Sequence, residues 1–244
     1  MDYDSYVKLQ KHYPRMVGND YTLPADLRLR FVSGVITVNA DDRALFLFER
    51  RNGYTKLHFR LIDNSASLAS HMETLAAFLT YRDDRFPEAA ADWLLGQGFV
   101  KTKTLRRHTA ASIAGSLSLD GIEFSSPDET YAMLGEYFSA VEADLPCREL
   151  FRSALCMRSQ DGSLLGVLYM GQTPVTAVAP EARGKGIGRK LYRAYAAIEA
   201  RVGKKTAFHE WVSPENGASL AMVESLGFTA DNVMTDCYVK EGHL

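Results

Sequence analysis

The sequence predicts an α+β (mixed α/β) fold in two similar halves, and three observations support this prediction. Pairs of β-rich runs joined by short turns indicate hairpins at residues 44–60 and 154–170. In each half a helical pattern ends in Gly-Phe and leads into a strand. Residues 109–120, rich in Ala, Ser and Gly, separate the two patterned regions. This segment is predicted to be a linker or crossover strand, and an apolar strand inside a single domain is the alternative.

Composition limits the class of protein. The chain has 244 residues, 46% of them hydrophobic and 24% charged, which is typical of a globular protein of one or two domains. The formal net charge of −2 favours neither nucleic acid nor a membrane as a partner. The N-terminus lacks a signal-peptide pattern, and Cys147, Cys156 and Cys237 share no CxxC spacing. We therefore expect a cytoplasmic protein with reduced thiols.

The first half contains one hairpin and two predicted helices. Asn52-Gly53 separates two β-rich runs, and this pair tolerates the positive φ angles of a tight turn. Residues 65–81 predict a helix, with one apolar face formed by Leu68, Met72, Leu75 and Leu79. A second helix is predicted to begin at Pro87 and end at Gly98, followed by a strand to about His108.

The second half is predicted to alternate helices and strands. Ser126-Pro127 opens one helix or two over residues 126–145. After the hairpin, the predicted order is strand 174–180, helix 188–202, strand 206–212, helix 213–228 and strand 232–240. The core-facing residues of the 188–202 helix are predicted to be Leu191, Ala194, Tyr195, Ile198 and Val202.

Two segments suggest an internal repeat at an offset of about 130 residues. PEAAADWLLGQGF (87–99) and PENGASLAMVESLGF (214–228) both begin Pro-Glu, continue as a helix and end Gly-Phe. Coincidence is the alternative, because helices that end before Gly-Phe are common. The first copy lacks any counterpart of the glycine-rich loop in the second.

That loop lies in VAPEARGKGIGRKLY, residues 178–192, between a strand and a helix. Its glycines fit neither G-x-G-x-x-G nor the P-loop pattern, which argues against a dinucleotide or P-loop site. The free N–H groups of a helix start favour an anion. Five cations surround the loop with no acid among residues 182–198: Arg183, Lys185, Arg189, Lys190 and Arg193. The pattern predicts a phosphate site, and a solvated basic surface is the alternative.

These motifs resemble the GNAT acetyltransferase family. Arg183, Gly186 and Gly188 match its [QR]-x-x-G-x-[GA] signature, and Asn216, Ser219, Gly227 and Phe228 match its later helix. The resemblance implies a mixed, mostly antiparallel sheet flanked by helices, splayed between the 174–180 and 206–212 strands. It also implies three parts: a degenerate GNAT-like domain at 1–108, a linker or crossover strand at 109–121, and an acetyl-CoA-binding domain at 122–244.

The resemblance also implies how acetyl-CoA would bind. Its pantetheine arm would pair with Thr176, Ala177 and Val178, with a backbone N–H near Val178 stabilising the oxyanion. Its pyrophosphate would lie on Arg183, Gly184, Lys185, Gly186, Ile187, Gly188 and Arg189. Asn216 and Ser219 would complete the site from the later helix. The six histidines have no metal-ligand spacing, so we expect no metal.

The proton-transfer residues are less determined. Glu210 and His209 lie on the strand beside the splay, on opposite faces, and either is a candidate base for the amine. The family's tyrosine acid aligns with Val223, which cannot donate a proton. Three explanations remain open. The hydroxyl of Tyr238 or Tyr192 replaces the missing acid, the CoA thiolate leaves without an acid, or the protein binds acyl-CoA without catalysing a reaction.

The predicted function is transfer of an acetyl group from acetyl-CoA to an amine of a small molecule or peptide, directly within a ternary complex. The alternative is a non-catalytic acyl-CoA-binding or interaction module. The sequence identifies neither the amine acceptor nor the oligomeric state.

Overall fold

The computed structural model describes residues 1–13, 17–19, 27–69, 72–151, 153–171, 174–202 and 207–242. Its contacts divide the chain into two compact units. The first unit comprises Met1–Thr104, Asp144–Leu150 and Val233–Leu244, and the second comprises Leu105–Ala143 and Phe151–Asn232. Each unit therefore takes residues from both halves of the sequence, and these boundaries differ from the predicted 1–108 and 122–244. That the first half is a degenerate copy of the second stays a prediction.

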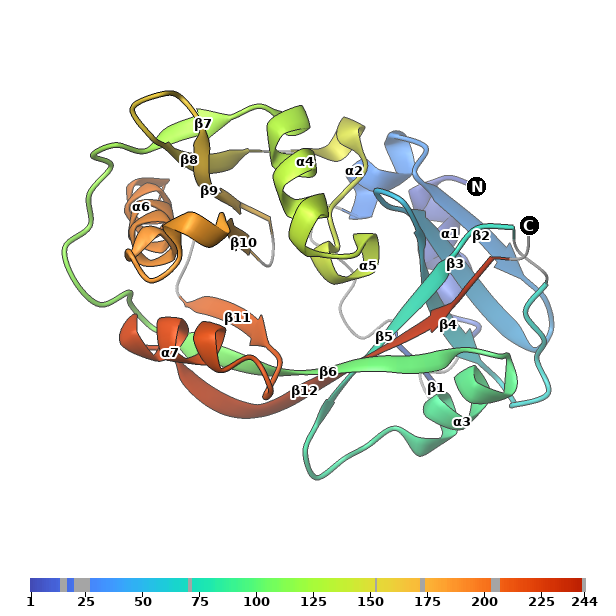
Figure 1. The fold of residues 1–244 in the computed structure, drawn as a ribbon. Helices are drawn as coiled ribbons and strands as arrows, with labels where there is room; N and C mark the ends of the chain where they lie inside the picture. The colour runs from blue at the N-terminus through green and yellow to red at the C-terminus, as the bar shows by residue number, and fades with distance from the viewer. Residues whose placement is uncertain are drawn as a thin grey trace. The chain divides into compact units, whose positions relative to one another are not determined.

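The first unit is built on a sheet (Figure 1). Its elements are α1 (Tyr3–Gln10), β1 (Val17–Gly18), α2 (Leu27–Val32), β2 (Ile36–Ala40), β3 (Ala44–Arg50), β4 (Thr55–Leu61), β5 (Leu75–Arg82) and α3 (Glu88–Gly96). The strands β2, β3 and β4 form an antiparallel meander, and β4 continues with a short parallel pairing to β5. Gly53 has a φ of 82° in the β3–β4 turn, which confirms the predicted hairpin.

Both faces of this sheet are covered, because β3 alternates its apolar side chains between them. Phe46 and Phe48 pack with Trp93 of α3 in one buried cluster. Leu45 and Leu47 pack with Tyr6 of α1 in a second cluster. Two cores therefore enclose the strands of the first unit.

The predicted helix over residues 65–81 is wrong. Residues 75–82 form β5, which pairs antiparallel with β12 (Thr229–Lys240) along its whole length. The apolar spacing fits a helix face, but Met72 is 86% exposed while Leu68, Leu75 and Leu79 are buried, so the four residues do not form one buried face. Long-range pairing outweighs the local helical pattern here. Residues 70 and 71 of the predicted helix lie outside the described residues.

The second unit contains a four-stranded antiparallel sheet in the order β10-β9-β8-β7. Its strands are β7 (Glu123–Ser125), β8 (Ala154–Arg158), β9 (Leu164–Tyr169) and β10 (Val175–Val178). The helices α4 (Pro127–Tyr137) and α6 (Ile187–Val202) pack on opposite sides of these strands (Figure 1). A capping box between Ser126 and Glu129 starts α4, with Pro127 in its first turn, as the sequence predicts. The short α5 (Ala140–Ala143) follows.

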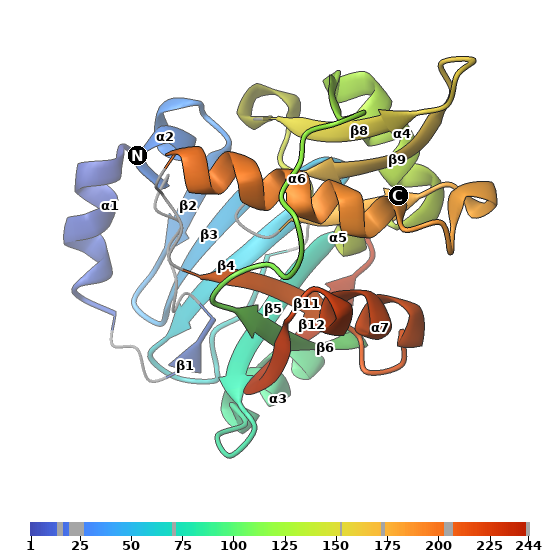
Figure 2. The same ribbon diagram turned by 90° about the vertical axis from the view of Figure 1, so that its left-hand side faces the viewer.

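The remaining strands of the second unit belong to an eight-stranded sheet in the order β11-β6-β12-β5-β4-β3-β2, with β1 beside β4. Residues 106–110 of β6 (Val100–Ala110) pair antiparallel with β11 (Phe208–Val212). The helix α7 (Gly217–Ser225) packs against β11, which lies beside it in Figure 2. These observations confirm the predicted α+β fold with a mostly antiparallel sheet flanked by helices. No described helix is long and apolar enough to cross a membrane.

Candidate functional site

The strands β10 and β11 part from each other within the second unit. They are consecutive strands of the chain, joined by α6, yet β10 ends the four-stranded sheet and β11 ends the eight-stranded one. Each therefore presents one edge that no described strand covers. This confirms the predicted splay, although Thr206, the first residue of the predicted 206–212 strand, lies outside the described residues.

The uncovered edge of β10 offers backbone groups to a ligand. Ala179 donates its N–H to the carbonyl of Leu165, and Ala177 is the Cα partner of Val167 on β9. Because antiparallel hydrogen bonding alternates along a strand, the backbone groups of Thr176 and Val178 point away from β9. The Val178 carbonyl accepts a hydrogen bond from Nε of Arg183 at 3.1 Å. The edge predicted to receive the pantetheine arm is thus a real edge of the sheet.

The glycine loop leads from this edge into α6. A short 3-10 helix, η2 (Pro180–Ala182), precedes Gly184 and Gly186, whose φ angles are 73° and 78°. The first intrahelical bond runs from the Lys190 N–H to the Gly186 carbonyl, so the preceding N–H groups of α6 lack helical partners. A Cβ at Gly188 would lie 2.6 Å from Sδ of Met222, so a larger residue here would require the Met222 side chain to shift. The loop has the shape of an anion site at a helix start.

The five loop cations differ in their surroundings. The Arg183 guanidinium lies 5.3 Å from the ring centroid of Tyr137 on α4. Nη2 of Arg189 lies 3.5 Å from the position of a Cβ at Gly186, and Lys185 and Lys190 are exposed. Arg193 instead donates through Nε to the carbonyl of Ala114, which fastens the predicted linker to α6. The positive charge at the loop therefore comes mainly from residues 183–190.

Two predictions concern the helices α6 and α7: the core-facing residues of α6 and the role of Asn216. Leu191, Ala194 and Tyr195 of α6 are buried as predicted, whereas Val202, the last residue of α6, is 52% exposed because the helix ends there. Asn216 caps α7: its side-chain oxygen accepts the N–H of Ser219 at 3.1 Å. Val223 is buried on the inner side of the same helix.

Glu210 is buried on β11, whereas the neighbouring His209 is exposed, which confirms their predicted opposite faces. Within the described residues, Oε1 of Glu210 is buried without a hydrogen-bond partner. Burial raises the pKa of Glu210 well above its ordinary value, and a backbone hydrogen bond from Trp211 opposes this only in part. A carboxyl held neutral in this way does not accept a proton until another group stabilises its charged form.

Thr176 on β10 has a similarly unpaired oxygen. Its Oγ1 is buried without a described partner. Val178 lies beside the α6 start, since its Cγ2 is 3.8 Å from a Cβ position at Gly188, and Thr176 shares that face of β10. On β11, Phe208 packs its ring 5.8 Å from that of Tyr195 on α6, and Glu210 shares the face of Phe208. Both unpaired oxygens thus lie on the α6 side of the two splayed strands.

Tyr238 does not belong to the second unit, which contains Thr176 and Glu210. It belongs to the first unit, where it lies in the buried cluster with Phe59 and Trp93. Burial, and then the charge of Asp236, raise the pKa of its phenol. A proton-transfer role would require its hydroxyl to be reached through that core.

We expect Tyr238→Phe to leave kcat unchanged, because the ring packs in a core and the hydroxyl is the only atom lost. Steady-state kinetics with acetyl-CoA and any accepted amine would measure this. A fall in kcat of ~10²–10⁴, with the fold and acetyl-CoA affinity retained, would instead identify Tyr238 as the acid.

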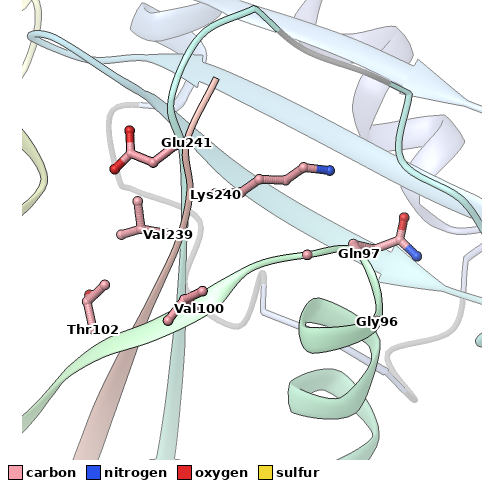
Figure 3. A pocket seen from close by; sticks show the side chains of 8 residues that line it. Gly96, Gln97, Val100, Thr102, Val239, Lys240 and Glu241 are labelled. Atoms are coloured by element: carbon pink, nitrogen blue, oxygen red, sulfur yellow. The ribbon is translucent and has the colours of Figure 1, made fainter. Parts of the chain in front are cut away.

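A separate groove of about 670 Å³ lies in the first unit, at the end of α3 (Figure 3). Val239 and Glu241 line it from β12 or just beyond its end, and Val100 and Thr102 line it from β6. The other lining residues are Gly96, Gln97, Gly98 and Lys240. None of the predicted site residues lines this groove. In the described parts of the chain, no group of three or more His, Cys, Asp or Glu side chains is arranged to hold a metal ion.

Sequence reasoning missed three neighbours of the site. His108 lies directly across from Glu210 in the β6–β11 register, Tyr137 packs on Arg183, and Met222 packs on Gly188. The two contacts that involve β6 and α4 join segments far apart in the chain, and no local spacing reports them. The position of Met222 near the site could have been predicted, because it directly precedes Val223, which the sequence aligns with the family's tyrosine on the same helix.

Comparison with known proteins agrees with this geometry. Residues 128–228 match the acetyltransferase (GNAT) family model. The N-acetyltransferase aca1 of Schizosaccharomyces pombe is 36% identical over 66 residues, which cover 27% of this chain and 32% of that protein.

Solved structures show the same fold at low identity. A structure described as a putative GNAT-family acetyltransferase, from Novosphingobium aromaticivorans, aligns with a TM-score of 0.57 at 16% identity, covering 87% of this chain and 93% of the other. A tandem GNAT protein from the clavulanic acid biosynthesis pathway aligns with a TM-score of 0.50 at 13% identity, covering 86% and 84%. Residues 128–228 therefore match the acetyltransferase (GNAT) family model, and the fold of the chain is similar to that of solved GNAT structures.

Proposed function

We propose that this protein transfers an acetyl group from acetyl-CoA to an amine within a ternary complex. The observation that supports it most is the continuity of the uncovered β10 edge with the glycine loop and the start of α6. A pantetheine arm is an extended chain of amides that needs backbone partners, and a pyrophosphate needs N–H groups and cations. The second unit offers the backbone partners on the β10 edge and the N–H groups and cations on the glycine loop that directly follows it.

The residues present fit such a donor. The unpaired Oγ1 of Thr176 supplies a further polar contact beside the strand edge, and the tight approach at Gly188 keeps the helix start close to β10. Arg183, Lys185 and Arg189 would hold the phosphates. The N–H of Val178, on the uncovered edge, would stabilise the oxyanion that forms at the thioester carbon.

Glu210 is the proposed proton acceptor for the attacking amine, with His209 as the exposed alternative. The thioester supplies a thiolate leaving group, whose ordinary pKa near ~8.5 permits departure without an acid at Val223. Glu210 receives the amine proton directly or through a water in the splay. Burial of the carboxyl makes it a stronger base once it is ionised.

Turnover of acetyl-CoA on a broad panel of primary and secondary amines tests this function. We expect release of free CoA with at least one acceptor, and a loss of ~10²–10⁴ in kcat for Glu210→Gln. A calorimetric titration should saturate at one acetyl-CoA per chain, since the glycine loop occurs once in the sequence. Tight binding of acetyl-CoA with no turnover on any amine of the panel would favour the alternative, a non-catalytic acyl-CoA-binding module. The neutral state favoured for Glu210 and the valine at position 223 are the observations that support this alternative.

A further inference from the structure

Glu210 has a histidine directly opposite it on the neighbouring strand. In the β6–β11 register, His108 is the Cα partner of Glu210. Directly opposed residues of antiparallel strands lie on the same face with their Cβ atoms about 4.5–5.5 Å apart. Both residues are buried, His108 to 4% exposure and Glu210 to 7%. The two side chains therefore share one buried face of the second unit.

A backbone contact orients the His108 ring. Its Nδ1 lies 3.2 Å from the carbonyl of Arg106. A carbonyl only accepts hydrogen bonds, so the tautomer that makes this contact carries its hydrogen on Nδ1 and has Nε2 as its second ring nitrogen. This leaves one ring nitrogen of His108 available on the face that it shares with Glu210.

Few other charged groups face this pair. On β11 the neighbours of Glu210 on the same face are Phe208 and Val212, and α6 contributes the ring of Tyr195 beside Phe208. On β6 the same face includes Arg106, two residues before His108. The adjoining β12 residues include Asp231, which pairs with Arg107 on the other face of β6 at 2.7 Å. His108 is thus the titratable side chain placed directly opposite Glu210.

We infer that His108 is the positioning residue for Glu210: its imidazolium stabilises the carboxylate form, so that Oε1 can accept the amine proton. This inference rests on the proposed function for its catalytic consequence. An unpaired buried carboxylate is costly, and a cation within about 4–6 Å offsets that cost. In the proposed step the proton lost by the amine passes to Glu210 and then to solvent.

The first test needs no turnover. NMR titration of the His108 ring in the free protein would compare the wild type with Glu210→Gln. If the carboxylate and imidazolium are paired, removing the carboxylate should lower the His108 pKa by at least ~1 unit. An identical His108 pKa in both proteins would overturn the inference, because it would mean that the histidine never faces an ionised Glu210.

The second test uses the pH dependence of kcat/KM. Loss of the cation raises the pKa of Glu210, so His108→Gln should move the acidic limb to higher pH by about 1 unit. The KM for acetyl-CoA should stay unchanged. A uniform fall in rate with an unmoved limb would indicate a structural role and contradict the inference.

His12→Gln is the matched control. The Nδ1 of His12 also lies near a backbone carbonyl, 3.3 Å from Leu9, but the residue is exposed on the first unit. This variant should keep the wild-type pH profile. If the wild type shows no turnover, the proposed function fails, and the NMR comparison still decides whether His108 and Glu210 form an ionised pair.

Discussion

Gly186→Asp should lower acetyl-CoA affinity at least ~100-fold, equivalent to about 2.8 kcal/mol. Gly186 has a φ of 78°, and its carbonyl accepts the first intrahelical bond of α6. An aspartate here would place a carboxylate at the helix start, where it would take the free N–H groups and repel a phosphate. The left-handed backbone adds about 1–3 kcal/mol of strain, which lowers stability without removing the fold. Isothermal titration calorimetry measures the change.

Gly162→Asp is the control for this variant. Gly162 lies in the β8–β9 turn with a φ of 87°, and a Cβ there would meet no atom within 4 Å. The substitution therefore adds the same charge and a similar backbone strain away from the loop. It should keep wild-type affinity. Equal losses in the two variants, or no loss in Gly186→Asp, would rule out the loop as the pyrophosphate site.

Glu49→Gln should destabilise the first unit by about 3–5 kcal/mol. The Glu49 side chain is 2% exposed and forms ion pairs with Arg30 and, at 2.8 Å, with Arg51. His58 lies 3.5 Å away on the adjacent strand. Glutamine keeps the size of the side chain but leaves two buried guanidinium groups without their shared carboxylate. Chemical denaturation followed by circular dichroism measures the loss.

The same variant should change the acid sensitivity of the fold. Burial raises the pKa of Glu49, but the hydrogen bond with His58 and the charges of Arg51 and Arg30 outweigh it and hold the pKa well below its usual range. Its stabilisation is therefore present above the unfolded pKa near ~4.3 and lost as the pH falls below it. Glu49→Gln should flatten that part of the stability curve.

Glu149→Gln provides the comparison within the same unit. Glu149 pairs with Arg50 at 3.0 Å, but its side chain is 53% exposed. Exposed pairs contribute about 0–1 kcal/mol, so this variant should unfold almost as the wild type does. Similar losses in both variants would show that burial does not distinguish the two ion pairs.

Local chemistry explains which elements the sequence predicts. The Asn52-Gly53 turn, the Ser126 capping box and the glycine loop each depend on residues within a few positions of one another. The sequence pattern therefore predicts the hairpins, the start of α4 and the anion loop. The splay was implied by family resemblance, and the sheet order confirms it.

The errors concern interactions between distant segments. β5 has a leucine spacing that suits a helix, and only its pairing with β12 makes it a strand. The sequence groups Arg193 with the loop cations, but its partner Ala114 is 79 residues earlier in the chain. The sequence predicts His108 only as the end of a strand, because the register that places it opposite Glu210 is a property of the folded sheet.

The division of β6 and β12 between the two units determines when each unit can be completed during synthesis. Phe208 pairs with Ala110, so the β6 edge in the second unit waits for nearly a hundred further residues before β11 covers it. At ~5–20 residues per second, that delay is on the order of ten seconds. The first unit waits longer still, until residues 233–240 emerge to pair with β5. The nascent chain therefore keeps two exposed strand edges until its last strands have been made, and such edges can pair with other chains during that interval.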